Sequence, residues 1–113
     1  MEKGGGGSID KFSKFVIYYF NNILEDNLKI ARTDRFKKAW EKLTKGEKTL
    51  ARKAITHLAS DIRYPALRAK KIKGVEGIWE ARLSLSLRIT FQIMGSTVLL
   101  RNIGRHDETI GHP

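Results

Sequence analysis

Two arginines stand in alternating polar and apolar segments, where their side chains could bind a phosphate group. Arg82 lies in the run 79–86, and Arg88 opens the run 88–94. Successive side chains of a β-strand point to opposite faces, so both arginines fall on the polar face of their predicted strands. A guanidinium group can bind phosphate through two parallel hydrogen bonds, a geometry that lysine lacks. We therefore expect Arg82 and Arg88 to converge on one phosphate.

A histidine follows the last apolar run, in the tract Gly104-Arg105-His106-Asp107-Glu108. A loop after a strand can present side chains over a sheet. Histidine side chains ordinarily titrate near pH ~6.5, so His106 is suited to proton transfer in either direction at neutral pH. The alternative is a loop histidine that is only held in place by Asp107 or Glu108.

Basic residues dominate the segment around the two arginines. Seven of them stand between residues 63 and 88, against Glu76 and Glu80; the seven are Arg63, Arg68, Lys70, Lys71, Lys73, Arg82 and Arg88. For single lysines such as Lys70 and Lys71, the ordinary interpretation is solvated surface charge. The segment as a whole predicts a basic surface around a pair of strands.

The charge of the chain favours a polyanionic partner. The formal net charge is +10, and it is unevenly distributed. Residues 1–27 hold three basic and four acidic side chains, whereas residues 28–113 hold 19 and eight. Nucleic acid is the first candidate partner, and the basic function belongs to residue 28 onward.

The composition excludes several classes of site. A chain of 113 residues fits one compact domain, and the absence of cysteine rules out a disulfide framework, a thiol nucleophile and a cysteine zinc site. The three histidines show no metal-ligand spacing, so no metal site is predicted. His57 falls in a predicted helix and is interpreted as structural, whereas His112 falls in a tail that is expected to fray.

No segment predicts insertion into a membrane or export. The apolar stretch 9–24 is interrupted by Asp10, Lys11 and Lys14, and a bilayer requires roughly 20 apolar residues. No cleavage site of a secretory signal follows it. A chain without cysteine also fits a reducing compartment, so we expect a cytoplasmic protein.

The N-terminal part divides into two segments. Residues 1–8, MEKGGGGS, predict a flexible leader or linker, because four consecutive glycines have too much conformational freedom to join a fold at low cost. Residues 9–27 predict an amphipathic helical extension, since apolar side chains recur there every three or four residues after a possible cap at Ser8. A strand over residues 16–20 is the competing interpretation.

The remainder of the chain, residues 28–113, begins with a strand and a helical hairpin. Residues 28–32 alternate like a short strand, and Thr33 is placed to cap a helix over 34–43. Thr44 and Glu47 form a capping box that starts a second helix near Lys45, which Pro65 should terminate. The inward positions are Phe36, Ala39, Trp40, Leu43, Leu50, Ala51, Ala54, Ile55, Leu58, Ala59 and Ile62.

Three strands follow the hairpin. Two-residue alternation covers 79–86 and 88–94, a tight turn stands at 94–96, and 97–103 is apolar enough for burial on both faces. The inward side chains are Trp79, Ala81, Leu83, Leu85, Ile89, Phe91 and Ile93, and Thr90 and Gln92 are expected outside. The predicted fold class is α+β, with the helical hairpin packed on one face of a small antiparallel β-α-α-β-β-β sheet and an extra N-terminal helix.

Four motifs in residues 28–113 together resemble the RelE/ParE toxin superfamily. They are Lys71-x-Lys73-Gly74, Ile78-Trp79-Glu80-Ala81-Arg82-Leu83-Ser84, Leu87-Arg88-Ile89-Thr90-Phe91-Gln92 and Leu100-Arg101-Asn102-Ile103-Gly104-Arg105-His106-Asp107. Each motif alone is weak, but their order and spacing behind a helical hairpin are specific. The second and fourth motifs look more like RelE-type messenger RNA interferases than ParE-type gyrase poisons.

The resemblance implies a toxin of a type II toxin–antitoxin system that cleaves ribosome-bound messenger RNA without a metal or other cofactor and is inhibited by a cognate acidic antitoxin. Such cleavage uses the 2'-hydroxyl of the RNA, and needs a base, cations for the phosphorane and an acid for the leaving oxygen. By resemblance Arg82 and Arg88 clamp the phosphate and His106 is the acid or base. By the same resemblance Lys71 and Lys73 hold the RNA backbone or take part in proton transfer. The side chains expected to bind RNA are Lys70, Lys71, Lys73 and Arg105.

One departure from the family leaves alternatives open. Many relatives carry a tyrosine near the C-terminus, and the tract 107–110 offers none. The alternatives are a ParE-like gyrase inhibitor, a non-catalytic RNA-binding module and a degenerate toxin. A metal hydrolase is disfavoured, because the histidines and carboxylates are scattered.

Overall fold

The computed structural model of this protein describes residues 28–113. The leader predicted over residues 1–8 and the helix predicted over residues 9–27 lie outside the described residues. No helix within residues 28–113 is long and apolar enough to cross a membrane.

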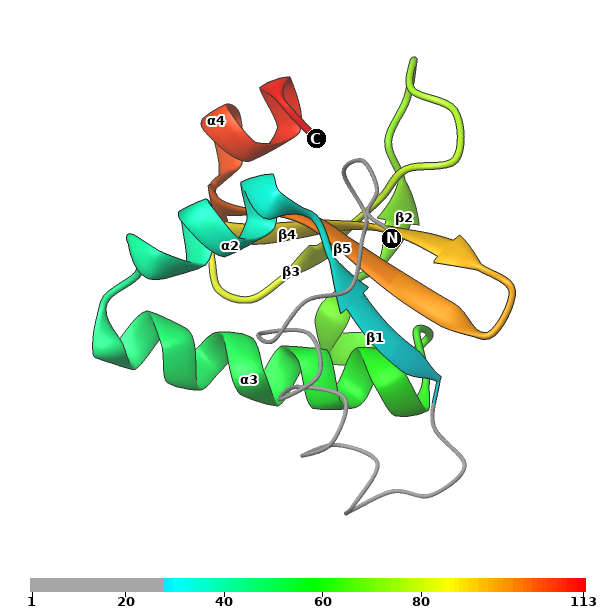
Figure 1. The fold of residues 1–113 in the computed structure, drawn as a ribbon, viewed down its shortest axis with the longest axis horizontal. Coiled ribbons are helices and arrows are strands. Elements are labelled where there is room, and N and C mark those ends of the chain that lie inside the picture. The colour runs from blue at the N-terminus through cyan, green and yellow to red at the C-terminus, as the bar shows by residue number, and fades with distance from the viewer. Residues whose placement is uncertain (1–27) are drawn as a thin grey trace.

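Residues 28–113 form five strands, three helices and a 3-10 turn. In chain order the elements are β1 (Lys29–Arg32), α2 (Asp34–Glu41), α3 (Lys45–Ser60), the turn Pro65–Leu67, β2 (Lys70–Lys71), β3 (Trp79–Arg82), β4 (Leu87–Met94), β5 (Thr97–Arg105) and α4 (His106–Gly111). The strands make one sheet in the order β1-β5-β4-β3-β2. Figure 1 shows α3 along one side of this sheet and α4 on the other side.

Both helices of the hairpin begin at the caps that the sequence predicts. The Thr33 hydroxyl accepts a hydrogen bond from the Phe36 amide at 3.1 Å, which satisfies an otherwise unpaired donor of α2. The Thr44 hydroxyl accepts from the Glu47 amide at 3.1 Å, and the Glu47 carboxylate accepts from the Thr44 amide at 2.9 Å. The predicted capping box of α3 is therefore confirmed.

The core lies between the hairpin and one face of the sheet. Phe36 and Trp40 of α2 and Ala51, Ile55 and Leu58 of α3 are buried with the sheet residues Ala81, Ile89, Phe91, Val98, Leu100 and Ile103. This confirms the α+β class and the helical layer on one face. Leu50, which the sequence places inside, is 44% exposed because it lies at the edge of the buried stripe of α3.

The sheet is mixed rather than wholly antiparallel. β1 pairs with β5 in parallel, and the other three pairings are antiparallel. The apolar run Val98–Leu100 of β5 is buried, so the backbone N–H and C=O groups at both edges of this strand need hydrogen-bond partners. β4 pairs with one edge and β1 with the other. The two-residue strand β2 and the helix α4 are also additions to the predicted order.

The structure differs from the predicted alternation in the loop between β3 and β4. β3 ends at Arg82, and the pairing of Arg82 with Arg88 closes the hairpin, with the Leu83 amide donating to the Leu87 carbonyl at 2.9 Å. Residues 83–86 therefore leave the pleat, and a strand through Ser86 was the wrong prediction. Leu85, predicted inside, is 87% exposed.

A second correction concerns β4. Thr90, expected in solvent, is fully buried, and its hydroxyl donates to the Pro113 carbonyl at 3.2 Å because the C-terminal segment covers this part of the sheet. Ile93, expected inside, is 37% exposed, beyond a register shift between Thr90 and Phe91. The extra residue at this shift, Arg101, is on β5, so Ile93 stays on the face of Ile89 and Phe91, and its exposure follows from its place near the end of β4.

Helix α4 approaches β5 closely at Gly104. A Cβ atom at Gly104, whose φ is 156°, would lie 3.0 Å from the hydroxyl oxygen of Thr109. Thr109 is itself buried. The absence of a side chain at Gly104 therefore allows α4 to pack against the end of the sheet.

We expect Gly104→Ala to lower the free energy of unfolding by about 1–3 kcal/mol, because the added methyl group forces α4 away from β5. Gly46→Ala is the matched control, since a Cβ at Gly46 meets nothing within 4 Å. In α3 that change should be neutral or stabilising by up to about 1 kcal/mol. Urea unfolding measures both, and equal effects of the two substitutions would contradict this account of α4.

Candidate functional site

The sheet face opposite α3 carries both predicted arginines. Side chains of residues directly paired across neighbouring strands point to the same face. Arg82 pairs with Arg88, and Arg88 pairs with Gly104. The two guanidinium groups thus start from adjacent positions, as the alternation predicts.

The Arg88 side chain holds the β3–β4 loop through hydrogen bonds. Its Nη1 donates to the carbonyls of Ser84 at 2.7 Å, Leu85 at 3.1 Å and Leu87 at 3.2 Å. Its Nε lies 3.8 Å from Oε1 of Glu80, and both side chains are only 11% exposed. Glu80 was not singled out from the sequence, although its place on the alternating polar face would have indicated it. Arg88 is therefore fixed in position by backbone carbonyls on one side and a carboxylate on the other.

Arg82 differs from Arg88 in its surroundings. Its side chain is half-buried, and within residues 28–113 it has no hydrogen bond or ion pair. A guanidinium group without such partners keeps all its donors for an incoming anion. Of the two arginines, Arg88 is held in place by the protein, whereas Arg82 has its side-chain donors available for a ligand.

His106 begins α4 instead of lying in a loop. Its amide donates to the Ser86 carbonyl at 2.9 Å, and Nη1 of Arg105 donates to the Ser86 hydroxyl at 3.2 Å. These bonds tie the start of α4 to the β3–β4 loop. Nδ1 of His106 lies 3.1 Å from Oδ1 of Asp107, and the imidazole is half exposed.

A hollow of about 530 Å³, here called the Arg88 hollow, gathers three of the predicted site residues. They are Arg88, Arg105 and His106, and the remaining lining residues are Leu85, Ser86, Asp107 and Glu108. Arg82 is the cross-strand neighbour of Arg88 but does not line the hollow. Two cations, an imidazole and a neighbouring arginine can together bind a phosphate and transfer a proton beside it.

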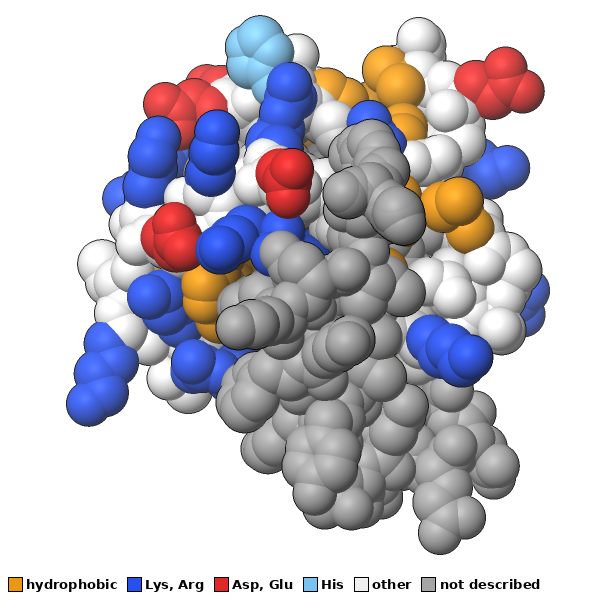
Figure 2. Space-filling view, viewed as in Figure 1, with side chains coloured by type: hydrophobic (Ala, Val, Ile, Leu, Met, Phe, Trp, Pro, Cys, Tyr) orange, Lys and Arg blue, Asp and Glu red, His pale blue; other side chains and the backbone are white. Residues whose placement is uncertain are grey.

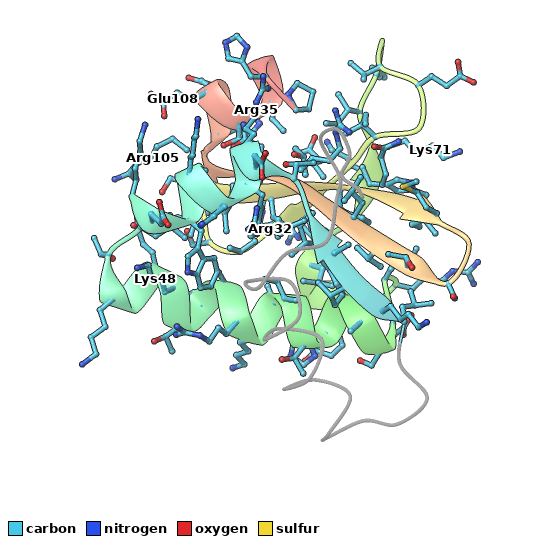
Figure 3. The ribbon with its side chains drawn as sticks, viewed as in Figure 1. Arg32, Arg35, Lys48, Lys71, Arg105 and Glu108 are labelled. Carbon is cyan, nitrogen blue, oxygen red and sulfur yellow. The ribbon has the colours of Figure 1, made fainter. Side chains whose placement is uncertain are left out.

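The predicted lysines lie away from the Arg88 hollow. Lys70 pairs with Glu80, which places it on the face of Arg82 and Arg88, whereas Lys71 pairs with Trp79 and holds its Nζ 5.7 Å from the centre of that ring. Trp79 packs against the core, so Lys71 is on the helix side of the sheet. Lys73 is exposed in the turn that follows. Figure 3 shows Lys71 at β2, on the opposite side of the view from Arg105.

The other two histidines stand outside the Arg88 hollow. His57 stacks on Tyr64, with ring centres 3.8 Å apart and an interplanar angle of 3°. The C-terminal tail is not frayed, because the His112 carbonyl accepts from Nη1 of Arg35 at 3.0 Å and from Nδ2 of Asn102 at 2.8 Å. The sequence prediction for the tail was wrong because these two partners lie on distant elements.

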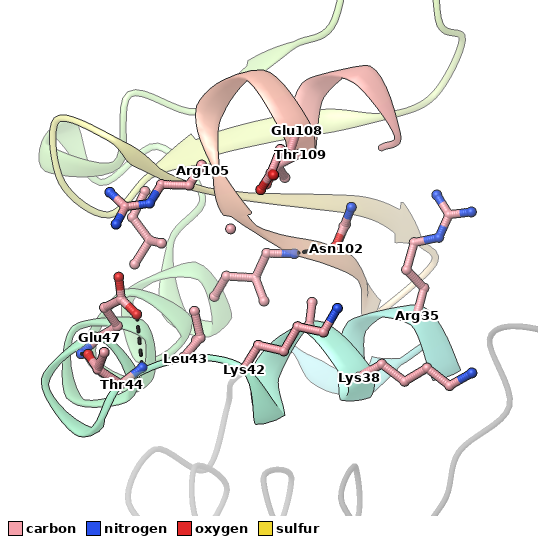
Figure 4. Close-up of a pocket in the computed structure, with 14 residues that line it drawn as sticks. Arg35, Lys38, Lys42, Leu43, Thr44, Glu47, Asn102, Arg105, Glu108 and Thr109 are labelled. Atoms are coloured by element: carbon pink, nitrogen blue, oxygen red, sulfur yellow. Dashed lines mark hydrogen bonds between the residues drawn. The ribbon is translucent and has the colours of Figure 1, made fainter.

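A larger hollow of about 710 Å³, the α2 hollow, lies between α2 and α4. Figure 4 shows Arg35, Lys38 and Lys42 extending from α2, with Arg105 and Glu108 across from them. Lys and Arg side chains also gather over α2 in the view of Figure 2. Arg35, Lys38 and Lys42 were not singled out as site residues from the sequence. Their spacing of three and four residues was the signal for one shared face.

Arg32 is a buried cation with a structural role. Arg32 is 1% exposed and donates to the Thr33 carbonyl at 3.0 Å and to the Asp34 carboxylate at 3.4 Å. Burial lowers the pKa of the Arg32 guanidinium from its ordinary value, and the hydrogen bond to Asp34 opposes this shift. Within residues 28–113 no three His, Asp or Glu side chains are grouped so as to hold a metal ion.

The contacts of the two arginines predict different effects on stability. Arg88→Ala should lower the free energy of unfolding by about 2–3 kcal/mol, because it removes the bonds to the loop and leaves Glu80 buried without its cation. Arg82→Ala should change it by less than about 0.5 kcal/mol. Urea unfolding tests both, and adding Glu80→Gln to Arg88→Ala should recover part of the loss. Equal stability of the two alanine variants would refute the structural role of Arg88.

Comparison with known proteins rests on structure, since no protein-family model and no curated protein sequence matches the chain. A metal-bound toxin from Helicobacter pylori superposes with a TM-score of 0.62 at 26% identity, over 72% of this chain and 97% of that one. YafQ from E. coli strain BL21(DE3) gives a TM-score of 0.62 at 13% identity, over 70% and 93%.

Toxin–antitoxin complexes give similar matches. A chain of the RelB–RelE antitoxin–toxin complex from Methanococcus jannaschii superposes with a TM-score of 0.60 at 18% identity, over 73% of this chain and 98% of that one. All three matched chains are covered almost completely. Residues 28–113 therefore have the fold of the RelE-like toxin superfamily, which confirms at the level of the fold the resemblance of the four strand motifs.

Proposed function

We propose that this chain is a RelE-like toxin of a type II toxin–antitoxin system, a cytoplasmic endoribonuclease that cleaves ribosome-bound messenger RNA without a metal ion and so inhibits translation. The observation that carries the proposal is the Arg88 hollow, where Arg88, Arg105 and His106 meet beside Arg82 on a fold shared with RelE and YafQ. Neither the hollow alone nor the fold alone would specify this reaction.

The proposed reaction is attack of the RNA 2'-hydroxyl on the adjacent phosphorus. The 2'-oxygen forms a bond to phosphorus, the bond to the 5'-oxygen breaks, and one proton is removed from the first oxygen while another is delivered to the second. Negative charge grows on the phosphate oxygens in the transition state. Arg82 has its donors available to bind those oxygens, and Arg88 presents a cation fixed by its carbonyl partners.

His106 is the proposed proton-transfer group. When Nδ1 carries its hydrogen and donates it to Asp107, Nε2 is left to accept or deliver a proton. The tie between the His106 amide and Ser86 holds the start of α4 beside the loop of Arg88. The imidazole therefore borders the same hollow as the phosphate-binding cations.

The proposed partner is an acidic antitoxin segment. Solved toxins of this fold include YafQ in its complex with DinJ and RelE in its complex with RelB. In this chain Arg35, Lys38, Lys42 and Arg105 around the α2 hollow suit a segment rich in carboxylates. Arg105 also lines the Arg88 hollow, so such a segment would compete with RNA for the same cation.

Arg82→Ala should reduce cleavage of translated messages by ~100-fold or more, the scale of losing one preorganised donor to the transition state. Primer extension on those messages measures the cleavage rate. Arg63→Ala is the matched control, because Arg63 is an exposed arginine in the segment after α3, and it should cleave like the wild type. Unchanged cleavage by a folded Arg82→Ala variant would contradict the proposal. Inhibition of DNA supercoiling without RNA cleavage would instead identify a ParE-like gyrase inhibitor.

A second variant tests proton transfer. His106→Gln removes the imidazole but keeps a polar side chain at the start of α4. We expect it to flatten one limb of the pH dependence of cleavage, and to lower the maximal rate by ~100-fold or more. The measurement is single-turnover cleavage across the pH range in which the wild type is folded. A pH profile with both limbs unchanged would remove His106 from the reaction.

A further inference from the structure

An exposed leucine stands at the edge of the Arg88 hollow. Leu85 is 87% exposed, compared with 55% for Met94, the next most exposed large apolar side chain of the described residues. An isolated apolar side chain on a surface needs no explanation by itself. Leu85, however, lines a hollow together with two arginines and a histidine.

The backbone around Leu85 is held on both sides. Nη1 of Arg88 donates to the carbonyls of Ser84 and Leu85, and the Leu87 amide donates to the Ser84 hydroxyl at 3.2 Å. Ser86, the next residue, accepts from the His106 amide. The backbone of Leu85 is therefore held in place while its side chain points to solvent. A ligand that covers Leu85 would not have to pay the entropy cost of ordering this loop.

The charged side chains around the hollow suit different parts of a nucleotide. Arg88 and Arg105 attract phosphate, whereas Asp107 and Glu108 repel it. A nucleobase is uncharged and has apolar faces, and leucine is one of the apolar side chains that can insert between neighbouring bases. The hollow of about 530 Å³ lies within the usual size range of small-ligand sites.

We propose that Leu85 is a substrate-positioning residue, which packs against the face of a nucleobase next to the scissile phosphate. This inference rests on the proposed function. Leu85 makes no bond to the reacting atoms and acts by holding the nucleotide in line with the cations of the Arg88 hollow.

The test combines a protein variant with a modified RNA. Primer extension first maps the bond that the wild-type full chain cleaves on a translated message. Synthetic messages then carry an abasic nucleotide on one or the other side of that bond. Leu85→Ala should reduce cleavage of the unmodified message by about 10-fold, the scale of losing most of one apolar side-chain contact. At one of the two abasic positions the wild type should slow by a similar factor, and Leu85→Ala should cause no further loss there.

Three controls make the result specific. Met94→Ala shortens an exposed apolar side chain at the opposite end of β4 and should cleave like the wild type. Leu85→Phe keeps a large apolar side chain at this position and, unlike Leu85→Ala, should cleave like the wild type. Urea unfolding should give Leu85→Ala the stability of the wild type, because so exposed a side chain contributes little to the core.

The outcomes separate this inference from the proposed function. If the wild type cleaves RNA but Leu85→Ala cleaves equally fast, the inference fails and the proposed function stands. It also fails if Leu85→Ala loses the same factor on both abasic messages as on the unmodified one, because its effect would then not pass through a base. If the wild type cleaves no message, both the proposed function and the inference are overturned.

Discussion

The candidate site depends on one set of hydrogen bonds, those between the Arg88 guanidinium and the carbonyls of residues 84, 85 and 87. They close the β3–β4 loop around a cation that Glu80 holds from the other side. The closed loop then offers Ser86 to the His106 amide and the Arg105 side chain, which fixes the start of α4. Arg88 thus has a structural role, and Ser86, Arg105 and His106 are held beside it through the loop that it closes.

The two faces of the sheet are covered by different kinds of contact. One face is covered by α2 and α3 and holds the apolar core, so its side chains are constrained by packing. The other face is covered by α4 and the C-terminal segment through polar contacts of Thr90, Asn102 and Arg101 with residues 112 and 113. Polar contacts leave room for hollows lined by charged side chains, and both hollows described above border α4.

Local patterns predicted most of the fold but only part of the site. Caps at Thr33 and Thr44 and the alternation around Arg82 and Arg88 depend on neighbouring residues, so the sequence contains them directly. The parallel pairing of β1 and the burial of Thr90 depend on how distant elements meet, which periodicity does not encode. Leu85 is exposed because a local loop over residues 83–86 interrupts the alternation. The two predicted RNA-binding lysines were also not separated by sequence reasoning. Lys70 and Lys71 are neighbours in sequence, yet they lie on opposite faces of the sheet.

The chemical form of the RNA ends tests the central claim most directly, because it reports which atom attacked the phosphorus. Mass spectrometry of the fragments released by the full-length wild type should find a 2',3'-cyclic phosphate on the upstream fragment and a 5'-hydroxyl on the downstream one. These ends require attack by the 2'-hydroxyl, the step that the arginines and His106 are proposed to assist. A 3'-hydroxyl paired with a 5'-phosphate would show attack by water, and would contradict the account.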